Sequence, residues 1–167
     1  MAVVPVLIED WQYECCGDPF KIGDRVTWQL CYFNDRPEFL SPPDQMRLSL
    51  GVDAIPDGPG AHLSSGELHV LWPDPSTKDG LAEIVGVLHE ERHSTPAVPA
   101  TTGFVRRIRQ MSVQHRNDPG TPTWHRVPGT ETFTELWESE AISPTPAQRE
   151  AGRWGVGMLV DLEVSLR

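Results

Sequence analysis

The residues that decide the fold are 20–30, which read Phe-Lys-Ile-Gly-Asp-Arg-Val-Thr-Trp-Gln-Leu. A Gly-Asp turn opens this run, and apolar residues then alternate with polar ones, the apolar residues being Val26, Trp28 and Leu30. A period of two is typical of a β-strand that buries one face in a core. The sequence therefore predicts a half-buried strand that begins at this turn.

The same kind of pattern elsewhere in the chain indicates an all-β fold. Residues 156–166 alternate between apolar and polar side chains, and residues 3–8 are rich in β-branched Val and Ile. Residues 102–108 fit either a helix or a bulged strand, and we favour the strand because Gly103 and Val105 are poor residues for a helix start. Shorter strands are expected at 46–52, 67–72, 81–93 and 131–137, and one short helix at 144–153.

The length and composition indicate one globular domain. The chain has 167 residues, of which 38% are hydrophobic, enough for a single core. Its 14 Gly and 16 Pro divide it into short segments and make residues 34–66 an elaborated Pro/Gly-rich loop. We expect one small all-β barrel over residues 1–167, SH3-like or OB-like, with long loops and at most one or two short helices. No segment fits a membrane span or a signal peptide.

Charge is distributed unevenly along the chain. The formal net charge is −10, so general binding to nucleic acid is not expected, because phosphates would be repelled. Between residues 104 and 129, however, five arginines accompany a single acid. In one interpretation this segment binds a small anionic ligand, and the candidate residues are Arg106, Arg107 and Arg109. In the other, the arginines pair with acidic side chains of neighbouring strands, such as Glu90 and Glu91.

The three cysteines have an odd count and no spacing typical of a disulfide scaffold, so we expect reduced thiols and a cytoplasmic protein. Cys15 and Cys16 are adjacent, and turn residues at 17–19 predict a bend beside them. A bend allows both thiols to point the same way, which makes the pair a candidate site for a soft metal or a reactive thiolate. The alternative is that the cysteines, Cys31 included, are small packing residues.

The opening of the chain resembles a family of small uncharacterised bacterial proteins. The shared pattern is Trp-x3-Cys-Cys-Gly-x-Pro-Phe-x2-Gly-Asp-x-Val-x-Trp, which begins at Trp11 and ends at Trp28. That family has no known function to transfer, so the resemblance supports a single domain and supplies no catalytic residues. A weaker similarity links the Gly-Asp turn at 23–24, and the later Gly-x-Val-x-x-Ile at 103–108, to the first two strands of small SH3-like barrels.

One catalytic pattern is present at residues 89–93, which read His-Glu-Glu-Arg-His. In zinc hydrolases with this spacing, a helix presents both histidines to one Zn²⁺ and the glutamate acts as general base. Here His89 and His93 would be the metal ligands and Glu90 the base. The preceding β-branched residues and Pro96 favour an extended segment, in which the two histidines lie about 13 Å apart, too far for one ion. In that interpretation Glu90 is a solvated residue at a strand end.

Other common catalytic signatures are absent from the sequence, including the nucleophile elbow, the Walker loop, the dinucleotide fingerprint and Cys-x-x-Cys. We therefore expect a non-catalytic binding or interaction module of unknown ligand, with no cofactor and no membrane partner. Its partner is a protein or a small anionic ligand, and the candidate binding residues are Arg106, Arg107, Arg109, Trp11, Cys15 and Cys16. A zinc-dependent hydrolase at 89–93 and a thiol or soft-metal site at 15–16 remain the alternatives.

Overall fold

The computed structural model describes residues 1–34, 40, 44–92, 97–140 and 144–167, which form twelve strands and two short helices. The strands are β1 (Ala2–Glu9), β2 (Arg25–Trp28), β3 (Leu30–Cys31), β4 (Met46–Ala54), β5 (Ala61–Ser65), β6 (Leu68–Trp72), β7 (Asp79–Gly86), β8 (Leu88–Glu90), β9 (Thr101–Asn117), β10 (Trp124–Arg126), β11 (Thr132–Leu136) and β12 (Arg153–Val164). The helices are α1 (Asp10–Cys16) and α2 (Pro146–Ala151). The all-β prediction is confirmed.

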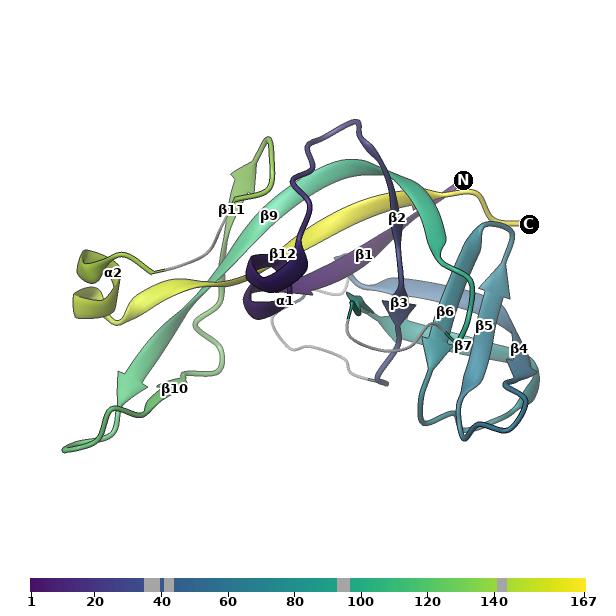
Figure 1. Ribbon diagram of the computed structural model, residues 1–167, viewed down its shortest axis with the longest axis horizontal. Helices are drawn as coiled ribbons and strands as arrows, with labels where there is room; N and C mark the ends of the chain where they lie inside the picture. The colour runs from purple at the N-terminus through teal and green to yellow at the C-terminus, as the bar shows by residue number, and fades with distance from the viewer. Residues whose placement is uncertain (35–39, 41–43, 93–96, 141–143) are drawn as a thin grey trace.

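The strands form one open sheet. Their order is β10-β9-β12-β1-β8-β3-β6-β5-β4-β7, and β2 and β11 also pair with β9. A barrel requires the two end strands of this path to pair with each other. In Figure 1, β10 and β7 lie at opposite ends of the molecule. The sheet is therefore not closed, and the predicted SH3-like or OB-like barrel is not supported.

The centre of the sheet is buried on both faces. β1 pairs antiparallel with β12 along its whole length and parallel with β8 on its other side. Every residue from 4 to 8 is buried; Val4, Val6 and Ile8 pack in the larger hydrophobic cluster and Leu7 packs in a second one. Successive strand residues point to opposite faces, so a strand covered on both sides is apolar without alternation. This explains the continuous apolar run at the start of the chain.

Strand β9 confirms the bulged-strand interpretation of residues 102–108. Asp161 of β12 pairs with Arg107, but the next residue of β12 pairs with Val105, so Arg106 is an extra residue opposite that step. An extra residue on one strand of an antiparallel pair is a β-bulge. Gly103 is required nearby, because a Cβ at that position would lie 2.7 Å from a carbonyl oxygen of β12.

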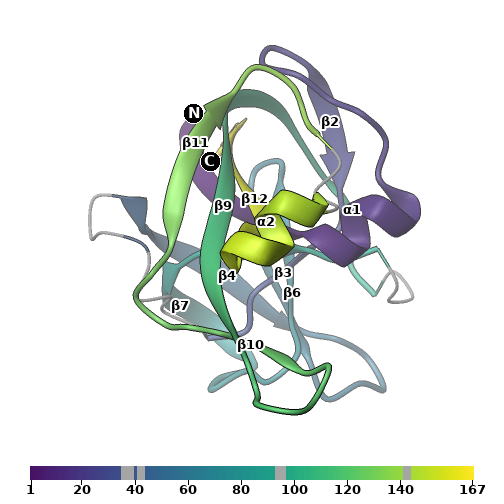
Figure 2. The same cartoon turned by 90° about the vertical axis from the view of Figure 1, so that its left-hand side faces the viewer.

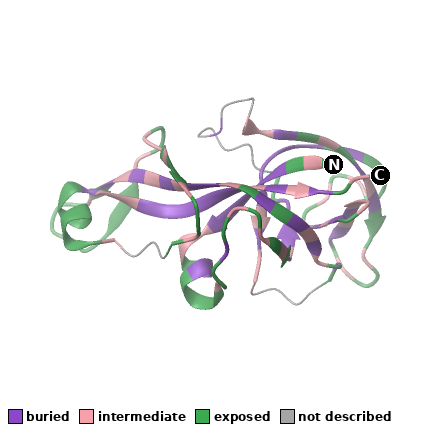
Figure 3. Cartoon of the chain, turned by 90° about the horizontal axis from the view of Figure 1, so that it is seen from above, coloured by how far each residue is buried: buried purple, intermediate pink, exposed green. Residues whose placement is uncertain are grey.

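The two ends of the molecule, which the long strands β9 and β12 connect, differ in how far their residues are buried. At one end, α2 starts with a capping box in which the Thr145 side chain accepts from the Gln148 N–H, as expected for the predicted short helix. None of its residues is buried, and Figure 3 shows this end as largely exposed. Figure 2 views the molecule from this end, with α2 in front of β9 and β12. The strands β4–β7 lie at the other end, where they contribute to the larger core cluster.

Three local predictions are wrong or incomplete. Residues 34–66 are not a single loop, because they contain β5 in addition to β4, the strand predicted at 46–52. Helix α1 was not predicted, because its seven residues are mostly poor helix formers. The strand predicted after the Gly-Asp turn at 23–24 is divided into β2, which pairs with β9, and β3, which pairs with β8 and β6. Trp28 and Leu30 are buried as predicted, whereas Val26 is only half-buried.

Candidate functional site

A cleft of about 650 Å³ lies between the end of α1, strand β2 and the end of β8. Figures 1 and 2 show α1 and β2 on the same side of the long strands. The cleft is lined by Cys16, Asp18, Pro19, Phe20, Asp24, Arg25, Val26, Thr27, Trp28, Gln29, Glu90, Glu91 and Arg92. Cys16 and residues 90–92, which come from two segments that the sequence marked for separate reasons, therefore meet at this cleft.

Glu90 is the buried acid of the cleft. It is the last residue of β8, and it shares a face with buried Leu88 because strand residues two apart point to the same side. Its side chain is 2% exposed, and its Oε1 lies 2.6 Å from Nη2 of Arg92. Among the described residues, Oε2 has no hydrogen-bond partner. Burial raises the pKa of Glu90, and the hydrogen bond from Arg92 opposes this effect. The prediction that Glu90 is a solvated residue at a strand end is therefore wrong.

Arg92 connects Glu90 to the end of α1. While Nη2 pairs with the Glu90 carboxylate, Nη1 donates a hydrogen bond to the carbonyl oxygen of Cys16. The Nε atom is buried and has no hydrogen-bond partner within the described chain. The cleft thus combines one buried acceptor and one buried donor that a bound polar group could satisfy.

Helix α1 ends at two adjacent thiols. The Gly17 N–H donates to the Tyr13 carbonyl oxygen at 2.8 Å, and a Cβ at position 17 would lie 2.5 Å from that oxygen. Glycine is therefore needed where the chain leaves the helix. Cys15 and Cys16 are both exposed, with Sγ atoms 2.6 Å apart. Their hydrogen bond raises the pKa of Cys16. The pair lies outside the strand ladder, as predicted, although in a helix end and not in a turn.

Cys31 differs from the other two cysteines, because it is buried in β3. Burial raises the pKa of its thiol to about 11. The interpretation of cysteines as packing residues therefore fits Cys31 and does not fit the exposed pair. Trp11, the remaining aromatic candidate, is exposed in the first turn of α1 and is not among the residues that line the cleft.

Two aromatic residues, Phe20 and Trp28, contribute to the apolar lining of the cleft. Phe20 and Trp28 are both buried and meet edge to face, with ring centroids 5.2 Å apart. Ser139 fixes the chain here, because its Oγ accepts from the Phe20 N–H at 2.9 Å and lies 2.8 Å from the Tyr13 hydroxyl. The connection between α1 and β2 is thereby held against the core, so the cleft wall is built on ordered contacts.

The arginines of the predicted basic segment are held by carboxylates of neighbouring strands. Arg106 of β9 pairs with Glu163 of β12, and Arg107 pairs with Glu135 of β11. These contacts fit the ion-pairing interpretation, but the partners are not those suggested from the sequence, Glu90 and Glu91. The anion-binding interpretation gains no support from guanidinium groups that already contact carboxylates.

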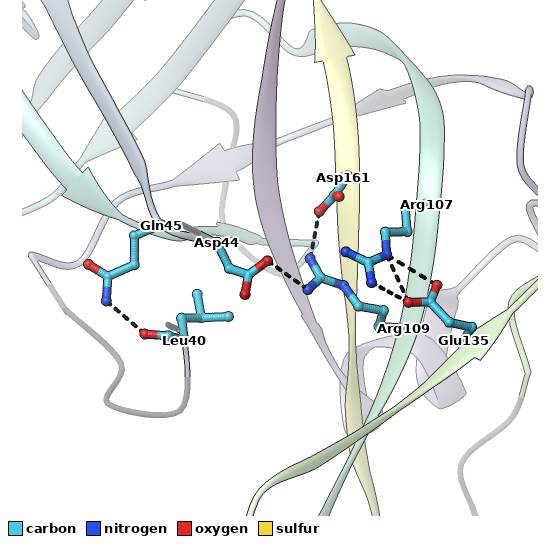
Figure 4. A network of polar contacts seen from close by, with 7 residues as sticks. All are labelled: Leu40, Asp44, Gln45, Arg107, Arg109, Glu135 and Asp161. Atoms are coloured by element: carbon cyan, nitrogen blue, oxygen red, sulfur yellow. Dashed lines mark hydrogen bonds and ion pairs between the residues drawn. The ribbon is translucent and has the colours of Figure 1, made fainter. Parts of the chain in front are cut away.

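Arg109 lies deeper than these two arginines, with only 6% of its side chain exposed. Figure 4 shows its guanidinium between two carboxylates, with the Arg107 pair beside it. Nη1 lies 3.2 Å from Asp44 and Nη2 lies 2.8 Å from Asp161. The guanidinium carbon also lies 5.7 Å from the ring centroid of Phe133. None of the three candidate arginines lines the cleft that contains Cys16 and Glu90.

The His-Glu-x-x-His residues do not form a helix in the described chain. Leu88–Glu90 is strand β8, which confirms the extended segment predicted there, and Glu91 and Arg92 lie outside any helix. The His89 ring packs edge to face with Phe33 at 5.1 Å, and His93 lies outside the described residues. Nowhere in the described ranges are three His, Cys, Asp or Glu side chains grouped so that they could hold a metal ion.

Sequence reasoning missed Arg92, which lines the cleft, and Gln12, a buried residue of α1. Arg92 occupied a variable position of the His-Glu-x-x-His pattern and was given no role. Gln12 is buried in α1, and its Oε1 has no hydrogen-bond partner within the described residues. One signal was available for Arg92: Glu90 shares the face of Leu88, and an acid on a buried face requires a nearby partner.

A comparison with protein families matches residues 2–164 to a family of unknown function, DUF6578. The chain belongs to this family. The match extends over nearly the whole chain and agrees with the expected membership in an uncharacterised family. No curated protein and no solved structure matches the chain. In the described part of the chain, no helix is both long and apolar enough to cross a membrane.

Proposed function

We propose that the protein is a binding module whose cleft between α1, β2 and β8 binds a small organic cation with an ammonium or guanidinium group. The observation that carries this proposal is the buried carboxylate of Glu90, whose Oε2 has no hydrogen-bond partner among the described residues. A charged N–H donor of a ligand would supply the missing hydrogen bond and compensate the buried charge.

The charges of the cleft favour a cation over the anionic ligand expected from the sequence. Four carboxylates and two guanidinium groups line it, which leaves two negative charges in excess. The residues concerned are Asp18, Asp24, Glu90, Glu91, Arg25 and Arg92. Since the whole chain carries a formal charge of −10, the field far from the cleft would also attract a cation and repel an anion.

The size and the apolar wall of the cleft support an organic ligand. Its volume of about 650 Å³ is typical of small-molecule sites. Phe20 and Trp28 provide aromatic surface, which suits the alkyl part of an organic cation as well as its charge.

The free state of all three cysteines supports a reducing compartment, and we propose the cytoplasm as the protein's location.

Isothermal titration calorimetry with three ligands of similar shape tests the proposal. Butylguanidinium carries the charge, butylurea is neutral, and pentanoate is anionic. We expect butylguanidinium to bind, butylurea to bind about tenfold more weakly, and pentanoate to give no measurable heat, because only the first satisfies the buried carboxylate as a charged donor. Equal affinity for the three ligands would contradict the proposal.

A matched pair of variants locates the binding. Glu90→Gln removes the charge while preserving the shape, and should weaken butylguanidinium binding about tenfold. Glu83→Gln removes an exposed carboxylate that pairs with Arg47 at the other end of the sheet, and should leave the affinity unchanged. Unchanged binding by the Glu90 variant, with its fold verified by circular dichroism, would place the ligand elsewhere.

A further inference from the structure

We infer that Cys15 and Cys16 form a dithiol site that binds trivalent arsenic compounds at the rim of the cleft. This inference is independent of the cation proposed above, because it depends on the two thiols and not on Glu90. The pair has the two properties that such a site needs: both thiols are exposed, and their Sγ atoms lie on the same side, 2.6 Å apart.

The backbone that carries the pair is fixed on both sides of Cys16. The Gly17 N–H closes the last turn of α1 on the Tyr13 carbonyl oxygen at 2.8 Å. Arg92 donates to the carbonyl oxygen of Cys16 from the opposite wall of the cleft. Two sulfur ligands on an anchored backbone bind one atom more tightly than two independent thiols, because the second bond forms within the molecule.

The geometry of the pair selects among thiophilic elements. Thiolates prefer soft ions and metalloids. Two-coordinate Cu(I) and Hg(II) favour sulfurs on opposite sides of the metal, whereas trivalent arsenic holds its three ligands in a pyramid, with adjacent sulfurs on one side. A zinc site would need about four ligands, and the described residues offer no group of three suitable side chains.

The binding step is an exchange of ligands with no oxidant or reductant. An organoarsenous acid, R–As(OH)₂, reacts with both thiols to give R–As bound to two sulfurs, plus two molecules of water. Two As–S bonds form and two As–O bonds break, arsenic stays trivalent, and each thiol proton leaves on a departing oxygen. The net reaction starts from two protonated thiols and releases no proton to the solvent.

The cleft beside Cys16 can accommodate the organic group R, the third substituent on arsenic. Cys16 is one of the residues that line the cleft, together with Phe20 and Trp28. An aryl group on the arsenic can therefore enter the cleft and pack against these rings. Cys31 offers no comparable site, because its single thiol is buried in β3.

Phenylarsine oxide, which is hydrated to the diol in water, is the probe. The reduced full-length chain is treated with one equivalent, passed through gel filtration with excess 2-mercaptoethanol, and analysed by intact-mass spectrometry. We expect one phenylarsenic group per chain, retained in the monothiol and released by 2,3-dimercaptopropanol. Cys15→Ser and Cys16→Ser should each release the probe about a hundredfold faster, because only one As–S bond remains.

Controls separate the dithiol from the rest of the molecule. Cys31→Ala and Glu83→Gln, which change residues outside the cleft, should retain the probe as the wild type does. If a serine variant does not fold, alanine variants at 15 and 16 should give the same fast release. Release from the wild type as fast as from Cys16→Ser would overturn the inference. Retention by the Cys15→Ser, Cys16→Ser double variant would overturn it as well.

Discussion

Two arginine–carboxylate clusters of this protein are built in opposite ways. Around Arg109 the guanidinium is buried, while its partners Asp44 and Asp161 keep 37% and 21% of their side chains exposed. In the cleft the carboxylate of Glu90 is buried, and the Arg92 side chain is 17% exposed. Arg109 contacts two carboxylates, although its Nε has no hydrogen-bond partner in the described chain. For Glu90 the described chain supplies one ion-pair partner, and its Oε2 has no hydrogen-bond partner there.

The difference is our reason for proposing that the cleft is the functional site and that the Arg109 cluster is structural. A guanidinium is weakly hydrated, so burying it between two acids costs little and joins strands of the sheet. A carboxylate is strongly hydrated, so burying it with one partner and one unsatisfied oxygen costs more than the pairing returns, as the raised pKa of Glu90 indicates. Perturbed groups of this kind concentrate at functional sites, which is why we place the function at the cleft.

The largest expected effect is at the structural cluster. Arg109→Ala should lower the free energy of unfolding by about 3 kcal/mol, because it removes a buried partner shared by two carboxylates. Arg47→Ala, which breaks an exposed pair, should cost at most about 0.5 kcal/mol. Urea denaturation monitored by tryptophan fluorescence gives both values. If the two variants lose the same stability, the Arg109 cluster has no structural role of the kind described.

How far the fold could be predicted depended on the range of the interactions that decide it. The alternation in 20–30 and in 156–166 predicted strands correctly, because burial of one face acts on neighbouring residues. Closure of the sheet depends on whether β10 and β7 meet, and nothing local encodes that contact. Strand β5 was missed because His and Ser occupy all three of its half-buried positions and weaken the strand signal.

The residues of the candidate site could also be predicted only as far as local sequence signals allowed. Adjacency alone identified Cys15 and Cys16, and the helix end does expose both thiols. Glu90 was identified through a zinc-site pattern that requires a helix, and the structure has a strand there. Its burial arises because β1 and β3 flank β8, and those strands come from segments about 60 to 80 residues earlier in the chain. The sequence pattern contains no signal for that arrangement.

The second largest effect on stability is expected from removing the charge of Glu90. Its pKa is raised in the folded protein, so between the unfolded and folded pKa values the native state binds more protons than the unfolded chain does. The contribution of Glu90 to stability therefore increases as pH falls through the folded pKa and decreases as pH rises. Glu90→Gln removes this dependence, and at neutral pH it should raise the free energy of unfolding by up to about 1 kcal/mol.

Urea denaturation of this variant and the wild type across the acidic range tests the prediction. The difference between the two proteins should shrink as pH falls, because the wild-type carboxyl then becomes protonated and neutral like the amide. A constant difference at all pH values would mean that Glu90 is not the source. Glu83→Gln, which changes an exposed carboxylate, is the matched control and should follow the wild-type curve.

The smallest effect is expected at the exposed pairs beside the Arg109 cluster. Arg107→Ala breaks the contact with Glu135 and should change the free energy of unfolding by at most about 0.5 kcal/mol, because exposed ion pairs are screened by water and salt. The change should also become smaller in 1 M salt. A loss as large as that of Arg109→Ala would show that burial does not distinguish the two arginines.

The pKa of Glu90 is the quantity that tests the central claim most directly. Carbon-13 NMR of the side-chain carboxyl, assigned with the Glu90→Gln variant, gives this value with and without butylguanidinium. The account predicts a pKa above the ordinary value of a glutamate, and a decrease when the cation binds, because a bound positive charge stabilises the carboxylate. A pKa that starts at the ordinary value, or that the cation leaves unchanged, would contradict the assignment of the cleft as the site.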